Sequence, residues 1–319
     1  MTPTVLITGG LGYVGGRVAE ALRRSGKYRL RLATRSVGNP PPAWLPDAEI
    51  VTLDVTSTSG LDNACRDVSS IVHLAALSEN DCLADPKRAL LINGLGTLNL
   101  LQAAQRAGVE RFLYFSTAHV YRAPLTGRID ESTVPRPVHP YAITHHIAED
   151  FVLAAHATHA ITGIVLRMSN GFGAPKHAGV NRWTLIVNDL CRQAVTTGRI
   201  VMRSAGQDQR NFISLEDVGR ASLHMLDLPV ALVGDGLFNL GGTSSMRVID
   251  LVGLILERCQ VVLGYRPALE HPVATGTEPP SLDYRSDRLF ATGFAPNTNM
   301  IGEIDATLRL CQSAFGVER

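Results

Sequence analysis

Two side chains capable of moving a proton, Tyr141 and His145, lie four residues apart in the segment 140–150 (PYAITHHIAED). If this segment is helical, the phenol and the imidazole lie on one face and can address the same ligand. A phenol transfers a proton near neutral pH only where its surroundings lower its pKa, whereas an imidazole titrates in that range unaided. The spacing fits a catalytic pair, and it also fits two side chains that only pack together.

A glycine-rich turn near the start of the chain predicts a dinucleotide site. In LITGGLGYVGG, Gly9, Gly12 and Gly15 follow an apolar run and open a helical pattern. Glycine here permits a tight turn and lets the backbone approach a pyrophosphate, which the helix N-terminus then faces. The spacing alone is weak evidence, but its strand, turn and helix setting favours a bound NAD or NADP.

The end of the second predicted strand, RLATRS, bears on the choice between these cofactors. An acidic residue there would favour NAD, but Thr34 occupies the position and Arg35 follows. Because arginine pairs with a 2′-phosphate through charge-assisted hydrogen bonds, NADP is slightly favoured over NAD; the alternative is a solvated surface arginine. Asp54, which closes the third predicted strand, is either an acceptor for the adenine amino group or an ordinary turn residue.

Short apolar runs alternate with helical patterns through the first half of the chain. Strands separated by helices of this length imply crossover connections and a parallel sheet covered on both faces. The predicted strands are 4–8, 30–34, 49–53, 70–74, 111–116 and 163–167, and the predicted helices are 13–25, 59–66, 86–107 and 141–159. After Arg167 the pattern becomes irregular, except that 212–226 is typical of one more strand and helix returning to the sheet.

These patterns predict an α/β fold with a Rossmann-type doubly wound parallel sheet. Residues 1–168 and 212–233 are expected to form the dinucleotide-binding domain. Residues 169–211 and 234–319 are expected to form a smaller, discontinuous C-terminal lobe that binds the substrate. The natural ligand site is the cleft between the two.

Composition narrows the class of protein. The chain has 319 residues, 45% of them hydrophobic, which is typical of a globular protein with a sizeable core. Thirty Lys and Arg against 29 Asp and Glu give a net charge of +1 without basic runs, which argues against a nucleic-acid partner. Five cysteines without metal-ligand spacing indicate a reducing, cytoplasmic location and no metal site. No apolar run approaches the roughly 20 residues that cross a membrane.

Several segments, in order along nearly the whole chain, resemble the extended short-chain dehydrogenase/reductase family of nucleotide-sugar epimerases, dehydratases and 4-keto reductases. The segments are TGGLGYVGG, DV at Asp54, VHLAA at 72–76, NGLGTLNLLQAA at 93–104, FSTAHVY at 115–121, PYAITHHIAE at 140–149, LRMSNGFGAP at 166–175 and RNFISLEDV at 210–218. The late segment YRSDRLFATGFAP at 284–296 resembles the family's closing segment.

The resemblance implies roles for individual residues. Tyr141 corresponds to the acid/base, and Thr117 corresponds to the hydroxyl that binds the reacting sugar oxygen. Hydride transfer at a carbinol carbon does require a proton to move on the neighbouring oxygen, which a phenol with a lowered pKa can do. Cofactor contacts are expected from Gly9, Gly12, Tyr13, Val14, Gly15, Thr34, Arg35, Asp54, Val55, Leu74, Ala75, Ala76, Asn93, Tyr141 and His145. Substrate contacts are expected from Ser78, His119, Asn170, Arg210, Arg285 and Arg288.

The chain departs from the family at one catalytic position, since the pattern is Tyr-x-x-x-Lys and His145 stands in place of the lysine. The lysine holds the nicotinamide ribose and its charge lowers the pKa of the tyrosine. A neutral imidazole can do the first but not the second. Three interpretations are open: an enzyme in which His145 replaces lysine, a slow enzyme with an altered proton relay through His145 or His119, and a cofactor-binding sensor or partner protein without turnover.

The reaction class follows from what surrounds Thr117. The family's dehydratases carry Asp-Glu after this residue, whereas this chain has Ala118 and His119, which argues against 4,6-dehydration. C4 epimerisation or 4-keto reduction of a nucleotide-diphosphate sugar remains, with Asn170 and Arg210 as candidate diphosphate donors. The apolar positions of the predicted helices 86–107 and 141–159 fit the family's four-helix homodimer, and they also fit packing against the sheet.

Overall fold

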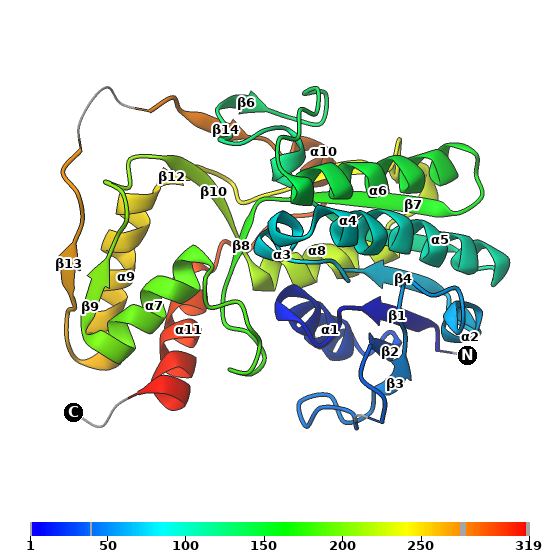
Figure 1. Ribbon diagram of the computed structural model, residues 1–319, viewed down its shortest axis with the longest axis horizontal. Helices are drawn as coiled ribbons and strands as arrows, with labels where there is room; N and C mark the ends of the chain where they lie inside the picture. The colour runs from blue at the N-terminus through cyan, green and yellow to red at the C-terminus, as the bar shows by residue number, and fades with distance from the viewer. Residues whose placement is uncertain (1, 39, 275–278, 317–319) are drawn as a thin grey trace.

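The computed structural model describes residues 2–38, 40–274 and 279–316, and its largest element is a parallel sheet of seven strands (Figure 1). The strands are β1 (Thr4–Thr8), β2 (Arg29–Thr34), β3 (Glu49–Thr52), β4 (Ser70–His73), β5 (Arg111–Thr117), β7 (Thr162–Met168) and β11 (Leu237–Leu240). Their order across the sheet is β11-β7-β5-β4-β1-β2-β3, so the succession reverses beside β1. Such a reversal opens a crevice at the carboxyl ends of the strands. The predicted Rossmann-type fold is confirmed.

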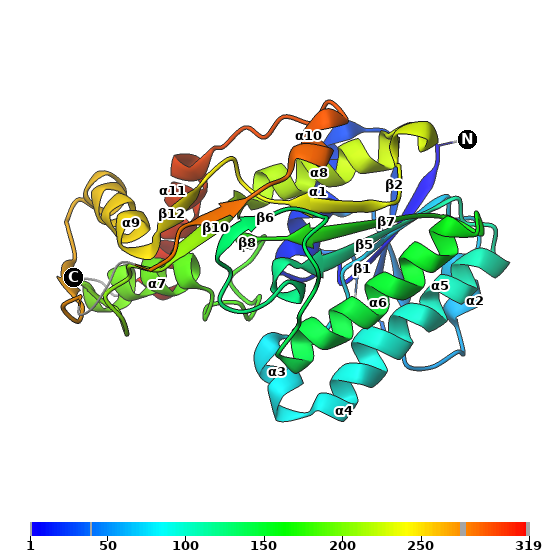
Figure 2. The same ribbon diagram turned by 90° about the horizontal axis from the view of Figure 1, so that it is seen from above.

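One face of this sheet is covered by α1 (Tyr13–Ser25) and α8 (Leu215–Asp227), with the short α10 (Asp287–Ala291) beside them (Figure 2). Apolar residues at helical spacing, such as Val18 and Leu22, are fully buried against the sheet. The two helices approach closely, because a Cβ on Gly219 would lie 2.7 Å from Ala21 Cβ. This packing places the N-terminus of α1 at the crevice.

The opposite face is covered by α2 (Leu61–Cys65), α5 (Gly96–Arg106) and α6 (Pro140–Ala157), and Figure 2 shows α5 and α6 side by side. Leu100 and Val152 are fully buried in this layer. The N-terminus of α6 is set by Pro140 in the first turn and by His139, whose imidazole accepts a hydrogen bond from the Tyr141 N–H. Pro140 and His139 thus fix where α6 begins, and with it the position of Tyr141 in the first turn.

The helix predicted over 86–107 is present, and its middle turn is π-helical. The structure has α3 (Glu79–Ala84), α4 (Pro86–Ala89), a π-helical turn η1 (Leu90–Leu95) and then α5. A Cβ on Gly96 would lie 2.6 Å from Val55 Cγ2, so the chain passes very close to the segment after β3. Such π turns arise where a helix accommodates an extra residue, frequently near a functional site.

The lobe beside the sheet consists mainly of α7 (Ile186–Thr197), α9 (Val248–Leu263) and α11 (Met300–Phe315), which share an apolar core that includes Leu251, Ile255 and Leu308. Small sheets complete it. They contain β8 (Asn170–Phe172), β10 (Gln209–Ser214) and β12 (Ser245–Arg247), and β9 (Arg199–Val201) with β13 (Ala268–Glu270). A further pair, β6 (Gly127–Ile129) and β14 (Leu282–Tyr284), lies near the 3-10 turn η2 (Ala118–Val120). A third short turn, η3 (Val230–Leu232), follows α8.

One predicted strand is wrong in its partners. The strand expected near Phe212 does not return to the large sheet, because β10 pairs with β8 and β12. The seventh strand is instead β11, which pairs in parallel with β7 and comes from the segment 234–319 that the sequence assigned to the lobe. The predicted helix within 212–226 does pack against α1, as α8. In the part of the chain that the structure describes, no helix has the length and apolar character needed to cross a membrane.

Candidate active site

A cavity of about 2100 Å³ runs from the carboxyl ends of β1, β2, β4 and β5 to α7 and β10. Small-molecule sites enclose roughly 300–1,000 Å³, so this cavity has room for a dinucleotide and a second ligand. The predicted residues that line it are Gly9, Gly12, Tyr13, Val14, Gly15, Thr34, Arg35, Asp54, Val55, Leu74, Ala75, Ala76, Ser78, Thr117, His119, Tyr141, His145, Asn170 and Arg210. Within the described ranges, no three His, Cys, Asp or Glu side chains gather so that they could hold a metal ion.

The glycine turn after β1 forms one end of the cavity. Gly9 has a positive φ of 70°, and its carbonyl accepts a hydrogen bond from the Gly12 N–H. A Cβ on Gly15 would lie only 2.1 Å from the Gly9 oxygen, so the turn requires glycine there. No side chain caps α1 and its first turn contains no acidic residue, which leaves the first N–H groups available to an anion. This cradle fits the diphosphate of a dinucleotide.

The next part of the cavity lies at the ends of β2 and β3. Thr34 and Arg35 line it, and Arg35 has no ion pair with any carboxylate in the described residues. The Asp54 carboxylate accepts hydrogen bonds from the N–H and the hydroxyl of Thr56, which hold its pKa below the usual value. This arrangement is compatible with an adenosine end, and it leaves the Arg35 guanidinium free to meet a phosphate.

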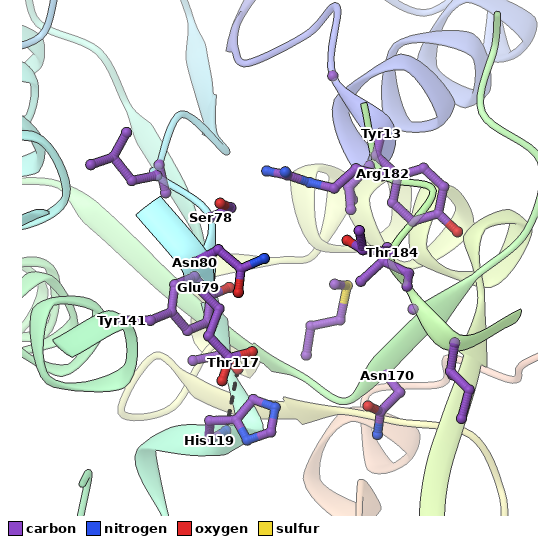
Figure 3. Close-up of a pocket in the computed structure, with 18 of the residues that line it drawn as sticks. Tyr13, Ser78, Glu79, Asn80, Thr117, His119, Tyr141, Asn170, Arg182 and Thr184 are labelled. Atoms are coloured by element: carbon purple, nitrogen blue, oxygen red, sulfur yellow. Dashed lines mark hydrogen bonds between the residues drawn. The ribbon is translucent and has the colours of Figure 1, made fainter. Parts of the chain in front are cut away.

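Tyr141 and Thr117 come together at the other end, where Figure 3 shows them on one wall with His119, opposite Asn170 and Thr184. The Thr117 hydroxyl interacts with the phenol, and its Oγ1 accepts the His119 N–H at 3.2 Å. Burial raises the pKa of Tyr141 to about 12, while the charge of Arg182 and the interaction with Thr117 act in the opposite direction. The predicted phenol and alcohol therefore converge on one point of the cavity.

His145 packs beside this pair, with its ring centroid 4.4 Å from that of Tyr141. Burial lowers the pKa of His145 to about 4, and His119 adds to this effect, so the imidazole is neutral at pH 7. Its Nδ1 lies 2.7 Å from the Tyr114 hydroxyl, whereas its Nε2 is buried and has no hydrogen-bond partner. An unpartnered nitrogen at the cavity fits the ribose hydroxyls of a dinucleotide. A charged imidazole in place of the family's lysine does not fit this burial.

The remaining predicted substrate residues line the cavity with their polar groups partly engaged. The Ser78 hydroxyl caps α3 by accepting the Asp81 N–H, and it donates to the Asp81 carboxylate at 2.5 Å. The Asn170 amide donates to the Asn211 carbonyl, which leaves its oxygen open. Arg210 is exposed at the start of β10. These positions lie where a second ligand would meet the lobe.

Three predicted residues lie outside the cavity lining. Asn93 is buried under it, where its oxygen accepts the Leu77 N–H and its amide donates to Thr144, so it braces the loop after β4 against α6. Arg285 pairs with Asp287 at 3.0 Å, and Arg288 pairs with Asp235 at 2.8 Å. Each of these three side chains is held by partners of its own, and their expected ligand contacts stay predictions.

The sequence analysis missed Arg182. Figure 3 shows its side chain extending from the side of Tyr13 toward Ser78, and its charge lowers the pKa of Tyr141. Its guanidinium forms no ion pair with the described carboxylates, and the one hydrogen bond of this group among the described residues is to the adjacent Asn181 carbonyl. A single arginine in the irregular segment NRWTL carries no periodic signal, so no pattern indicated it.

Comparisons with known proteins identify the family of the chain. The model of the NAD dependent epimerase/dehydratase family matches residues 5–241. A UDP-glucose 4-epimerase from Azospirillum brasilense is 28% identical over 306 residues, which cover 90% of this chain and 85% of that protein. Another, from Rhizobium leguminosarum bv. trifolii, is 30% identical over 273 residues, which cover 80% and 81%.

Two solved structures have the same fold. The UDP-N-acetylglucosamine 4-epimerase from Methanobrevibacter ruminantium, in complex with UDP-N-acetylmuramic acid, has a TM-score of 0.80 at 20% identity and covers 98% of this chain and 99% of its own. The UDP-glucose 4-epimerase from Thermus thermophilus, in complex with NAD, has a TM-score of 0.76 at 23% identity. The match covers 98% of this chain and 99% of that one. Because the family match spans well over half of its residues, the chain belongs to the NAD dependent epimerase/dehydratase family, an enzyme family of the extended short-chain dehydrogenase/reductase type.

Proposed function

We propose that this protein is an NAD(P)-dependent enzyme that epimerises a nucleotide-diphosphate sugar at C4 or reduces the corresponding 4-keto sugar. One observation carries the proposal. The side chains of Tyr141 and Thr117, whose hydroxyls interact, lie beside His145 with its unpartnered nitrogen, in the same cavity as the glycine turn. Relatives that are UDP-glucose 4-epimerases support C4 as the reacting carbon.

Each residue has a separate task. Tyr141 takes the proton from the sugar hydroxyl during oxidation and returns it during reduction. Thr117 holds the same oxygen and shares its developing charge. The nicotinamide, when bound, supplies the acceptor and donor of the hydride. His145 holds the ribose through Nε2 and carries no charge, so Arg182 and the oxidised cofactor are the sources of positive charge near the phenol.

The lobe binds the nucleotide diphosphate. Arg210 offers a guanidinium at the cavity, and Asn170 offers an amide oxygen from the wall opposite Tyr141 (Figure 3). An arginine fork suits phosphate oxygens, and an amide suits sugar or ribose hydroxyls. Arg182, whose charge acts on Tyr141, contributes a second cation to an anionic substrate.

The preference for NADP over NAD rests on Arg35. The solved relatives include NAD complexes, whereas this chain has an arginine without an ion pair where a 2′-phosphate would lie. Arg35→Ala should weaken NADPH binding about fivefold, from the loss of one charge-assisted contact of about 1 kcal/mol at an exposed site, and leave NADH binding unchanged. Titration of both reduced cofactors by fluorescence measures this, with Arg29→Ala, an exposed arginine at the start of the same strand, as the control. Equal effects on both cofactors would assign the site to NAD.

A second candidate is favoured by the charges at the reacting end. A Tyr141 pKa of about 12 beside a neutral His145 leaves little phenolate at pH 7. A protein with this site can bind a dinucleotide and sense its level without turning over a sugar. This candidate predicts tight cofactor binding with no product from any nucleotide sugar.

The test is to incubate the purified protein with UDP- and dTDP-linked hexoses and their 4-keto forms, with each cofactor, and to follow products by proton NMR. Interconversion of C4 epimers without net cofactor consumption supports the epimerase. Oxidation of one NAD(P)H for each 4-keto sugar reduced supports the reductase. Micromolar cofactor affinity with no product supports the sensor, and no cofactor binding contradicts all three.

The protein is further proposed to act as a cytoplasmic homodimer. Large apolar side chains are exposed on α3, η1 and α6, namely Leu83, Leu90, Leu91, Leu95, Ile143 and Phe151. A surface of this kind on adjacent helices is typical of a protein interface. Light scattering should give twice the mass of one chain, and Phe151→Glu should shift the protein to the monomer. A wild-type monomer at micromolar concentration would contradict the proposal.

A further inference from the structure

We propose that Tyr114 is a positioning residue that sets the tautomer of His145, so that the imidazole presents an Nε2–H donor to the ribose of the bound dinucleotide. The proposal rests on the proposed function for the identity of this ligand. It concerns a residue that does not line the cavity itself and acts only through His145.

The geometry places the two side chains in a closed pair. Tyr114 lies on β5, three residues before Thr117, and is 2% exposed. Its hydroxyl lies 2.7 Å from His145 Nδ1, and the two rings are nearly parallel with centroids 5.8 Å apart. Among the described residues, this imidazole is the one hydrogen-bond partner of the Tyr114 hydroxyl.

The tautomer follows from hydrogen-bond satisfaction. A buried phenol has one proton to donate, and Nδ1 is the acceptor within reach. If Nδ1 carried the proton instead, the phenol proton would remain buried without an acceptor, at a cost of about 1–3 kcal/mol. The Tyr114 hydroxyl therefore donates to Nδ1, and the ring proton of the neutral imidazole is on Nε2.

This proton lies on the one ring nitrogen of His145 that no described protein group satisfies. His145 lines the cavity, and Nε2 is its one ring nitrogen without a partner although the residue is only 3% exposed. A buried polar atom without a partner is uncommon and costly, which points to a ligand that completes it. A ribose hydroxyl oxygen can accept a hydrogen bond from Nε2–H. Tyr114 makes Nε2 the donor in this hydrogen bond, because its hydroxyl keeps the ring proton off Nδ1.

The Tyr114–His145 pair performs one of the two tasks of the family's lysine, which is to donate a hydrogen bond to the ribose. An ammonium offers three rotatable donors and a charge, whereas this imidazole offers one donor of defined direction and no charge. Removal of the Tyr114 hydroxyl frees the imidazole to adopt either tautomer. In the Nδ1–H form, Nε2 can no longer donate to the ribose, so the bound state loses that contact in part of the population.

The first experiment reads the tautomer without any turnover. Protein with 15N-labelled histidine rings is examined by NMR, with and without NADH or NADPH, and the His145 signals are assigned from their absence in His145→Gln. The expected result is an attached proton on Nε2 of His145 in the wild type. A proton on Nδ1 would overturn the proposal, whether or not Tyr114→Phe folds.

The second experiment measures the coupling. Tyr114→Phe should weaken the binding of the better cofactor about tenfold, and in a His145→Lys background the same change should have less than about a twofold effect, because lysine needs no tautomer. Tyr121→Phe is the matched control, since it removes a buried tyrosine hydroxyl that donates to Asn239 at 2.7 Å and does not line the cavity.

The outcomes separate this inference from the proposed function. Equal losses of affinity in the two backgrounds, or an equal loss in Tyr121→Phe, would show that Tyr114 only packs. If the wild type binds neither cofactor, the proposed function fails, whereas the NMR result on the tautomer still stands. Cofactor binding with a proton on Nδ1 would refute the inference alone.

Discussion

The two ends of the cavity are built differently. At the glycine turn the site consists of backbone, namely the Gly9 to Gly15 loop and the first N–H groups of α1. At the reacting end it consists of the side chains of Thr117, Tyr141 and His145, which come from β5 and α6. The first end follows the family's pattern, and the second departs from it.

This difference shows where substitution can change the chemistry of such a fold. A backbone cradle depends on the absence of side chains, so almost any change at its glycines destroys it. A site made of side chains can exchange one group for another and lose only part of its function. In the proposed site, the replacement of lysine by His145 keeps a donor for the ribose and gives up a charge.

The largest expected effect lies at the backbone end. In Gly15→Ala, the new methyl group would meet the Gly9 backbone at 2.1 Å, and the turn must open. A loss of about 3 kcal/mol, which corresponds to roughly 100-fold weaker binding of both cofactors, is expected in a fluorescence titration. Gly253→Ala on α9, where nothing lies within 4 Å, is the control and should leave affinity unchanged. Unaltered binding in Gly15→Ala would place the cofactor elsewhere.

The two ends also share a pH dependence. Burial lowers the pKa of His73, beneath the glycine turn, to about 3 and that of His145 to about 4, so both resist protonation in the folded state. In the unfolded chain, each of these histidines has a pKa of about 6.5 and takes up a proton below that pH. The contribution of the two neutral histidines to the free energy of unfolding is therefore complete above about pH 6.5 and is lost as the pH falls. When the pH is lowered from 7 to 5, which is still above the range in which carboxylates titrate, each histidine should reduce the free energy of unfolding by about 2 kcal/mol.

Urea unfolding at pH 7 and pH 5 measures this loss of stability. In His145→Gln, the difference between the two pH values should be smaller by the contribution of one histidine. A difference equal to that of the wild type would mean that His145 is charged in the folded protein, and the neutral-imidazole account of the reacting end would be wrong.

A smaller effect is expected from restoring the lysine. In His145→Lys, a cation beside Tyr141 stabilises the phenolate, so the turnover rate at pH 7 should rise about tenfold and the pH optimum should move downward. The pH profile of turnover checks this, with Tyr121→Phe as a control away from the cavity. Complete loss of turnover in a folded variant that still binds cofactor would give His145 a chemical role of its own.

The sequence predicted the first end almost completely, because its signals are local. Both β1 and α1 have the predicted bounds, and the glycines lie between them. The topology of the sheet was less accessible. The four-residue strand β11 has no periodic signal, and β10 has the composition of a sheet strand although it pairs within the lobe.

At the reacting end, the residue types were predictable and their states were not. Spacing and resemblance indicated Thr117 and Tyr141, and both residues line the cavity, while their catalytic roles stay predictions. The charge state of His145 depends on burial by several elements, and its bond to Tyr114 joins α6 to β5. Arg182 and Tyr114 were missed for the same reason, since contacts between distant segments leave no spacing in the sequence.

The most direct test of the account is Tyr141→Phe, in which turnover of the best nucleotide sugar and cofactor affinity are measured on the same preparation. The account predicts a loss of turnover of at least about 100-fold, because the proton has no acceptor, with a cofactor Kd within about twofold of the wild type. Turnover that survives this change unaltered would contradict the assignment of Tyr141 as the acid/base.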